Sequence, residues 1–228
     1  MNAGMNRIFL VRHGENRANL TKEFSHRLVD YPLTAKGRLQ AEQTADYLRT
    51  FPVTQVFSSP LKRAYETAEI IASAVGAEMR VLEDFRELNV GILEAQPPSA
   101  ATWKQHDDII WAWAKGNAEA RFPEGENFTE LVGRIRRGYE TICRGRNGET
   151  LVLVAHGGSL SLPLLSLIPE LDRALLQRTV HHNCAVGELE ALFGDTLRLR
   201  LVRWASATHL YGEAAAFVAG TPVEGDLE

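Results

Sequence analysis

The stretch Ile8-Phe9-Leu10-Val11-Arg12-His13-Gly14-Glu15-Asn16 decides the fold expected for this chain. Its first four residues are apolar and include two β-branched side chains, which is typical of a buried strand. The strand ends at Arg12 and His13, and Gly14 permits a backbone turn that most residues resist. In an open parallel sheet, ligands bind beyond the carboxyl ends of the strands. The stretch therefore puts a guanidinium and an imidazole where such a fold binds ligands, although an Arg-His-Gly triplet alone could equally be a polar turn.

The bulk properties of the chain are those of a globular protein with a large core. It has 228 residues, of which 45% are hydrophobic and 24% charged. The formal net charge of −4 gives no basic surface for nucleic acid, but a local arginine cluster can still bind an anion. Residues 1–7 lack the apolar segment of a secretory signal, and no apolar run approaches the roughly 20 residues of a membrane span. We therefore expect a cytoplasmic protein with no nucleic-acid or membrane partner.

Hydrophobic periodicity predicts alternating strands and helices after this first strand. A helix capped by Thr34 is expected to reach about Arg49, and a strand follows at Val53–Ser58. Ser59 can cap the next helix, and the proline after it suits the first helical turn. A short strand is expected at residues 78–82. This order implies right-handed crossovers and a parallel sheet.

The second half of the chain adds a central strand and a hairpin. Leu151-Val152-Leu153-Val154-Ala155 is continuously apolar, as in a strand buried on both faces. A leucine-rich helix is expected from Ser159 with Pro163 in its first turn, and a hairpin over residues 185–204. The helix that begins at Asn127 is expected to place three arginines on its solvated side: Arg134, Arg136 and Arg137. These elements predict an α/β fold, a three-layer α/β/α sandwich around a mostly parallel, mixed sheet.

The domain organisation is expected to be simple. We expect a single domain over residues 1–212, with a helical excursion at about 94–124 that lies over the active site. The excursion carries three tryptophans, for which ordinary packing is favoured over substrate contact: Trp103, Trp111 and Trp113. Residues 213–228 are rich in alanine, glycine and acidic residues, and we expect them to form a loose tail.

Two strands of this scheme end in a histidine followed by a glycine, at His13 and His156. If these strands are parallel neighbours, both imidazoles face one pocket. Arg63 falls in the first turn of a helix that follows another strand, where backbone N–H groups attract anions. Together with Arg12, these groups predict a phosphate site. Neither of the glycine-rich phosphate motifs, GxxxxGK[ST] or GxGxxG, occurs in the chain.

These residues resemble the motifs of the histidine phosphatase superfamily, which includes cofactor-dependent phosphoglycerate mutase. The matching motifs run in the family's order over roughly residues 8–190: Leu10-Val11-Arg12-His13-Gly14-Glu15 with Asn19, Pro32-Leu33-Thr34 with Gly37 and Gln40-Ala41, Ser58-Ser59-Pro60-Leu61-Lys62-Arg63-Ala64, Glu87 with Gly91, Gly125-Glu126, and Val154-Ala155-His156-Gly157-Gly158. Each motif alone is weak, but the set is specific, and it implies a phosphoglycerate mutase-like fold.

The resemblance also implies roles for the matched residues. His13 would attack phosphorus and carry a covalent phosphoryl group. Three side chains would hold the phosphate oxygens, namely Arg12, Arg63 and His156, and Asn19 would line the same pocket. For His13 to attack, one ring nitrogen must be unprotonated, so the other is expected to donate to a backbone carbonyl.

Glu87 matches the position of the family's proton donor. The leaving alkoxide needs a proton, so Glu87 must be protonated when the ester bond breaks and can then act as a base toward water. The alternative is a surface carboxylate in a loop, since three other acidic residues lie nearby: Glu83, Asp84 and Glu94.

We expect no metal and no cofactor. The remaining histidines lack metal-ligand spacing and are expected to have structural roles: His26, His106, His181, His182 and His209. The two cysteines, Cys143 and Cys184, form no metal-binding or redox pattern and are expected to be buried small hydrophobes.

The sequence leaves three functions open. The first is a metal-independent phosphoric monoester hydrolase that acts on a small phosphorylated metabolite through phosphohistidine. The second is a phosphoglycerate mutase, although residues 88–95 depart from the run that mutases carry after the proton donor. The third is a non-catalytic phosphate- or partner-binding module on the same fold. A homodimer is an open possibility, and the sequence does not define the substrate.

Overall fold

The protein contains a six-stranded mixed sheet with strand order β3-β2-β4-β1-β5-β6. The structure, a computed structural model, describes residues 4–222, except for the side chains of residues 177 and 178. The strands are β1 (Asn6–Arg12), β2 (Val53–Ser58), β3 (Glu78–Val81), β4 (Thr150–Ala155), β5 (Val186–Phe193) and β6 (Leu197–Ser206). The first four are mutually parallel, whereas β5 and β6 run antiparallel and form the predicted hairpin.

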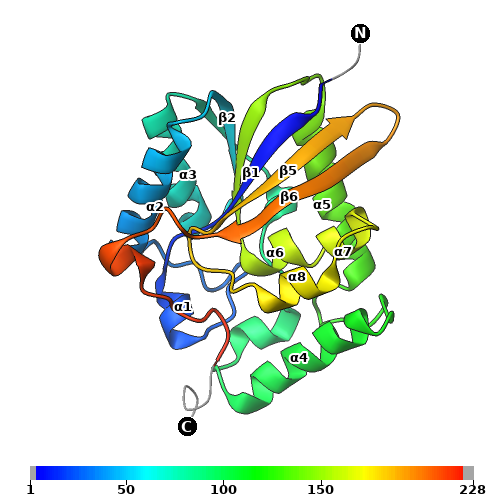
Figure 1. The fold of residues 1–228 in the computed structure, drawn as a ribbon. Helices are drawn as coiled ribbons and strands as arrows, with labels where there is room; N and C mark the ends of the chain where they lie inside the picture. The colour runs from blue at the N-terminus through cyan, green and yellow to red at the C-terminus, as the bar shows by residue number, and fades with distance from the viewer. Residues whose placement is uncertain (1–3, 223–228) are drawn as a thin grey trace.

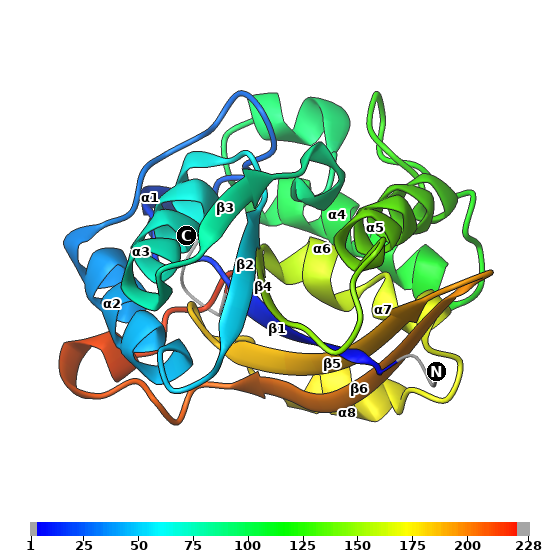
Figure 2. The same ribbon diagram turned by 90° about the horizontal axis from the view of Figure 1, so that it is seen from above.

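Helices cover both faces of this sheet, which confirms the three-layer prediction. Figure 2 shows α2 and α3 on one face and α5, α6 and α7 on the other. The helices are α1 (Arg17–Thr21), α2 (Ala35–Leu48), α3 (Lys62–Val75), α4 (Ala100–Ala114), α5 (Phe128–Cys143), α6 (Gly157–Ser161), α7 (Leu164–Leu167) and α8 (Arg173–Arg178), with 3-10 turns η1 (Glu83–Phe85), η2 (Gly91–Ala95) and η3 (Gly212–Ala215). Within the described residues, no helix has the length and apolar character needed to cross a membrane.

The alternation of side chains along β1 divides the core into two layers. Phe9 and Val11 pack with residues of α2 and α3, whereas Ile8 and Leu10 belong to the cluster that contains Ile135 of α5. All four β1 side chains are at most 1% exposed. Successive residues of a strand point to opposite faces, so a continuous apolar run is what a strand covered on both faces requires.

Two predicted helices differ from those in the structure. The helix predicted to begin after Ser59 begins at Lys62, and its N-cap, Leu61, makes no side-chain capping bond. The single leucine-rich helix expected from Ser159 is divided into α6 and α7, with Pro163 as the N-cap of α7. Proline has no backbone N–H and therefore cannot continue the hydrogen-bond ladder of α6.

Part of the predicted loose tail, at residues 213–222, contacts the rest of the protein, although half of these residues are exposed. Ala214 is fully buried, and its carbonyl accepts a hydrogen bond of 3.1 Å from Gln40 Nε2. Lys22 Nζ donates to the Ala219 carbonyl at 3.0 Å. Small residues permit these close backbone approaches, which composition alone does not reveal. Residues 223–228 of that prediction lie outside the described residues.

Helix α4 belongs to the excursion predicted at residues 94–124. Figure 1 shows α1 and α4 near the end of the sheet at which β1 finishes. Trp103 and Trp113 are 9% and 7% exposed, whereas Trp111 is 61% exposed. Trp103 also lines the cavity described below, so the prediction of ordinary packing is incomplete for that residue.

Candidate active site

The register of two parallel strands brings the two predicted histidines together. Arg12 of β1 pairs with Ala155 of β4, so the next residues, His13 and His156, follow at the same level. The backbone N–H of His13 donates to the Ala155 carbonyl at 2.9 Å. The centroids of the two imidazoles are 5.2 Å apart, and both residues are buried. The two strands are parallel neighbours and their histidines are adjacent, as expected, but only His13 lines the cavity described below, so the expectation that both imidazoles face one pocket is met only for His13.

The protonation of His13 is set by its backbone neighbour. His13 Nδ1 donates to the Gly14 carbonyl at 2.7 Å, which leaves a lone pair on Nε2. Arg63 Nε points at that lone pair at 3.1 Å. Burial, followed by the charges of Arg63 and Arg12, holds the pKa of His13 well below its usual value. His13 is therefore a neutral imidazole with its unprotonated nitrogen beside a guanidinium.

The turn after β1 is fixed by contacts that sequence reasoning missed. The Gly14 N–H donates to Thr67 Oγ1 at 3.0 Å. A Cβ on Gly14 would lie 2.5 Å from the Gly37 carbonyl oxygen, so the turn requires glycine. Asn183 Nδ2 donates to the His13 carbonyl at 3.0 Å and to Asn19 Oδ1 at 3.1 Å. Asn183 therefore connects the predicted pocket residue Asn19 to the backbone of His13.

The two predicted arginines are buried beside His13. Arg63 is held by Ser25, whose hydroxyl accepts from NH1 at 2.7 Å and whose carbonyl accepts from NH2 at 3.0 Å. Arg12 donates to the carbonyl of His181. Burial lowers the pKa of each guanidinium to about 10, so both stay cationic at neutral pH. Within the described residues, Arg12 Nε has no hydrogen-bond partner.

His156 lies behind His13 and is not one of the residues that line the cavity. It is fully buried, and its Nε2 is 2.7 Å from Ser59 Oγ. The serine predicted to cap a helix therefore bonds to this histidine instead. Burial and the charge of Arg63 hold the pKa of His156 well below its usual value. Its Nδ1 has no hydrogen-bond partner among the described residues.

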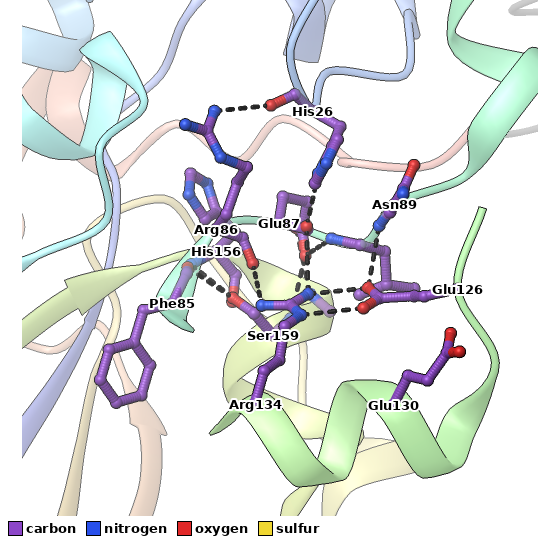
Figure 3. Close-up of polar contacts among 12 residues, drawn as sticks. His26, Phe85, Arg86, Glu87, Asn89, Glu126, Glu130, Arg134, His156 and Ser159 are labelled. Carbon is purple, nitrogen blue, oxygen red and sulfur yellow. Dashed lines mark hydrogen bonds and ion pairs between the residues drawn. The ribbon is translucent and has the colours of Figure 1, made fainter. Parts of the chain in front are cut away.

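The carboxylate of Glu87 lines the cavity at the N-terminus of α6 (Figure 3). The backbone N–H groups of Ser159 and Leu88 donate to Oε1 at 2.9 and 3.0 Å, and that of Gly158 donates to Oε2 at 3.2 Å. The helix N-terminus accounts for the position of this side chain, because its free N–H groups attract a carboxylate. The alternative of a surface carboxylate does not describe Glu87.

Three further charged groups hold the loops around the site. Glu94 Oε1 accepts hydrogen bonds of 2.5 to 3.1 Å from the four successive backbone N–H groups of residues 26–29, next to Ser25. Arg134 was predicted on the solvated side of α5, and this prediction is wrong, because its guanidinium contacts the carbonyl of Glu87. Glu15 also supports a loop, through an ion pair of 3.0 Å with Lys36.

These side chains surround a cavity of about 470 Å³. Arg12, His13, Asn19, Arg63 and Glu87 all line it, so five of the six predicted site residues face one space. Two histidines that were expected to have only structural roles, His106 and His181, line it as well. Within residues 4–222, no three His, Cys, Asp or Glu side chains come together in a group that could hold a metal ion.

Comparison with known proteins identifies the family. Residues 8–205 match the family model of the histidine phosphatase superfamily (branch 1). The chain belongs to this superfamily. The probable phosphoglycerate mutase GpmB of Yersinia enterocolitica is 35% identical over 193 residues, which cover 82% of this chain and 85% of that protein. The protein of the same name from Escherichia coli O1:K1 is 34% identical over 186 residues, with the same coverage.

Solved structures of the superfamily share the fold. A mycobacterial glucosyl-3-phosphoglycerate phosphatase in complex with VO3 gives a TM-score of 0.70 at 26% identity, over 88% of this chain and 99% of that one. A phosphoserine phosphatase mutant from Entamoeba histolytica, in complex with phosphoserine, gives a TM-score of 0.71 at 23% identity, over 91% of this chain and 100% of that one. The phosphoglycerate mutase-like histidine phosphatase fold predicted from the motifs is confirmed.

Proposed function

We propose that this protein is a metal-independent phosphomonoesterase that works through a phosphohistidine intermediate. One observation carries the proposal: the unprotonated Nε2 of His13 is 3.1 Å from the Arg63 guanidinium, at the wall of a cavity that Arg12 and Glu87 also line. Phosphoryl transfer requires in-line positioning and neutralisation of charge more than covalent chemistry. The neutral imidazole of His13 is a positioned nucleophile, and the two buried guanidiniums beside it neutralise the charge of the phosphoryl group.

In the first step, His13 Nε2 attacks phosphorus and the bond from phosphorus to the ester oxygen breaks. Arg12 and Arg63 stabilise the negative charge on the phosphoryl oxygens. The ring of His156 lies beside that of His13, with the two centroids 5.2 Å apart. Glu87, in its protonated form, gives its proton to the leaving oxygen, so the alcohol departs uncharged. The Gly14 carbonyl stabilises the positive charge that His13 acquires, because it accepts the hydrogen bond from Nδ1.

In the second step, water attacks the phosphohistidine. The Glu87 carboxylate takes a proton from this water, and the bond between Nε2 and phosphorus breaks. Inorganic phosphate leaves, and His13 returns to its neutral form with the proton on Nδ1. No step uses a metal ion or a cofactor.

A second candidate, phosphoglycerate mutase, is favoured by the relatives named GpmB. It would transfer the phosphoryl group between positions of phosphoglycerate, starting from a bisphosphorylated primer, without net release of phosphate. The third possibility, a non-catalytic binding module, is disfavoured because the nucleophile, both arginines and Glu87 are present and assembled.

The test is phosphate release from p-nitrophenyl phosphate with EDTA present, by the intact protein and by His13→Ala. We expect release that survives EDTA and falls by about a thousandfold or more in the variant. Equal release by both proteins would refute the role of His13. Release by neither would favour the mutase, and an isomerisation assay with 3-phosphoglycerate and primer would then separate it from a binding module.

A further inference from the structure

The cavity has an apolar part that phosphate chemistry does not explain. Beyond the arginines and His13, its wall includes large apolar side chains from separate parts of the chain: Phe24, Leu88, Val90, Trp103, Ile110 and Phe217. A cavity of about 470 Å³ is larger than a phosphate group needs and is in the range of small-molecule pockets. This apolar part therefore offers the alcohol part of a substrate a surface to bind.

The aromatic side of this wall is held rigidly. The indole N–H of Trp103 donates to the Lys22 carbonyl at 3.0 Å, which fixes the ring. The rings of Phe24 and Trp103 have centroids 4.4 Å apart, and His106 lies 5.4 and 5.1 Å from them. Trp103, His106 and Ile110 follow at helical spacing and so share one side of α4. A flat ring can stack on such a surface without reorganising it.

The same wall offers no cation to the alcohol. Among the described residues that line the cavity, Arg12 and Arg63 are the only arginines or lysines, and both are beside His13. Burial lowers the pKa of His106, so its ring is neutral at neutral pH. Glu23 lines the cavity and carries a negative charge. A carboxylate on the alcohol would lose hydration, meet no cation besides the two arginines that hold the phosphate, and be repelled by Glu23.

We propose that the substrate is a phosphomonoester of an uncharged, ring-bearing alcohol, and that Trp103 is its main specificity residue. This inference rests on the proposed phosphatase function. It distinguishes the protein from enzymes that act on phosphoglycerate, whose alcohol carries a carboxylate.

The test compares three esters of primary alcohols: 2-phenylethyl phosphate, ethyl phosphate and 3-phosphoglycerate. We expect kcat/KM for 2-phenylethyl phosphate to exceed the other two by about tenfold or more. Trp103→Leu should remove most of this advantage and lower kcat/KM for ethyl phosphate by a much smaller factor. Trp111→Leu is the matched control, because Trp111 is on the same helix but is 61% exposed and does not line the cavity.

Equal or faster hydrolysis of 3-phosphoglycerate would overturn the proposal, and so would an equal loss on all three esters in Trp103→Leu. Titration calorimetry with 2-phenylethylphosphonate and 2-carboxyethylphosphonate separates this failure from a failure of the proposed hydrolysis. Preferred binding of the phenyl compound without any turnover would retain the substrate class and refute hydrolysis. Preferred binding of the carboxylate, or equal binding, would refute the substrate class.

A different observation concerns the support of Glu87. All five N–H bonds of the Arg134 guanidinium have acceptors. NH1 donates to the carbonyls of Asp84 and Arg86, both at 2.7 Å, and NH2 donates to the Glu87 carbonyl at 3.2 Å. Nε and NH2 pair with the two carboxylate oxygens of Glu126 at 2.8 and 2.7 Å. Figure 3 shows this guanidinium between the Glu126 carboxylate and the backbone that carries Glu87.

Glu126 completes the support from the other side. Its Oε1 also accepts the backbone N–H of Asn89 at 2.9 Å. His26 Nδ1 adds a contact of 2.9 Å to the Glu87 carbonyl. The side chains of Arg134 and Glu126 are 14% and 8% exposed, so water screens the pair weakly. The backbone is therefore held on both sides of Glu87, and the N-terminus of α6 binds the Glu87 carboxylate.

We infer that Arg134 and Glu126 are positioning residues that place Glu87 for proton transfer to the leaving oxygen. Lysine cannot replace this arginine, because an ammonium lacks the planar fork that reaches a carboxylate and three carbonyls together. The inference does not depend on the identity of the alcohol.

Leaving-group dependence tests this role. p-Nitrophenolate leaves without a proton, whereas an alkoxide requires one. In Arg134→Lys and in Glu126→Gln, we expect the single-turnover rate of alcohol release from 2-phenylethyl phosphate, which reports the first step alone, to fall by about tenfold to a hundredfold. The corresponding rate for p-nitrophenyl phosphate should fall by less than about threefold. Glu87→Gln should show the same pattern, and Arg136→Gln, at an exposed position of α5, should show no change.

An equal loss on both esters would mean that the pair has only a structural role and would overturn the inference. A loss confined to KM would overturn it as well. Circular dichroism at the assay temperature shows whether each variant is folded. If Arg134→Lys does not fold, Glu126→Gln serves as the test, because glutamine has nearly the same shape as glutamate.

Discussion

The two ends of the cavity are built in different ways. The phosphate end consists of polar side chains on adjacent strand and helix ends, each held by backbone contacts such as those of His13 with Gly14 and Ala155. The alcohol end consists of apolar side chains from separate segments, including Phe24, α4 and the C-terminal segment with Phe217. The difference implies that variants at the phosphate end should affect all substrates, whereas variants at the alcohol end should affect only those with a large alcohol.

Among the variants that test this comparison, Arg63→Lys is expected to lose the most activity. Lysine keeps the charge but loses the Nε contact with His13 and the two hydrogen bonds with Ser25. We expect kcat/KM to fall by about a hundredfold or more, by the same factor for ethyl and 2-phenylethyl phosphate. Steady-state kinetics of both esters measures this, with Lys62→Ala, an exposed neighbour on α3, as the control. A loss that differs between the two esters would contradict the division of the cavity into a phosphate end and an alcohol end.

The rigidity of the phosphate end predicts a large effect of Gly14→Ala. The new Cβ would lie 2.5 Å from the Gly37 carbonyl oxygen, and neither backbone can move freely. We expect the free energy of unfolding to fall by about 2 kcal/mol, measured by urea denaturation. Gly133→Ala on α5 is the matched control, since its Cβ would be 3.8 Å from its neighbour and alanine favours a helix. Unchanged stability of Gly14→Ala would show that the turn can adapt.

A smaller and selective effect is expected for Phe217→Ala at the alcohol end. Phe217 lines the cavity and is 50% exposed, so only part of its surface can contact substrate. We expect kcat/KM for 2-phenylethyl phosphate to fall by about fivefold, with no change for ethyl phosphate. Tyr211→Ala provides the control, because Tyr211 is an exposed aromatic residue of the same C-terminal part that does not line the cavity. Equal losses on both esters would place Phe217 at the phosphate end instead.

The smallest predicted effect concerns pH: the His13 ring at the phosphate end should not take up a proton near neutral pH. The pKa of His13 lies well below its usual value, so the neutral ring should persist as the pH falls from 7 to 5.5. The unfolded chain binds this proton near pH 6.5, so folding stability should decrease as the pH falls below that value. NMR of the His13 ring against pH checks the first expectation, with His13→Gln used for assignment. A midpoint near 6.5 would contradict the buried, neutral nucleophile.

Much of the fold and of the phosphate end could be predicted from local sequence. The apolar run before Arg12 and the run before His156 predicted two buried strands, and parallel strands end at the same edge of a sheet. Some local interpretations nevertheless failed. Ser59 bonds to His156 rather than capping a helix, and Arg134 turns inward on a helix face that sequence reasoning assigned to solvent. Local patterns cannot show which polar side chain finds a partner on another segment.

The sequence by itself thus determined the succession of strands and helices along the chain and the strand and helix ends at which His13, His156 and Arg63 lie. It also determined that the nucleophile must be neutral. These features follow from periodicity and from the geometry of parallel strands, both of which are local or general. Only the tertiary structure decided that Trp103 meets Phe24, that the carbonyl of Ala214 accepts a hydrogen bond from Gln40, and that Arg134 supports Glu87. Each of these contacts joins segments far apart in the chain, and their approach depends on how whole elements pack, which no short stretch of sequence encodes.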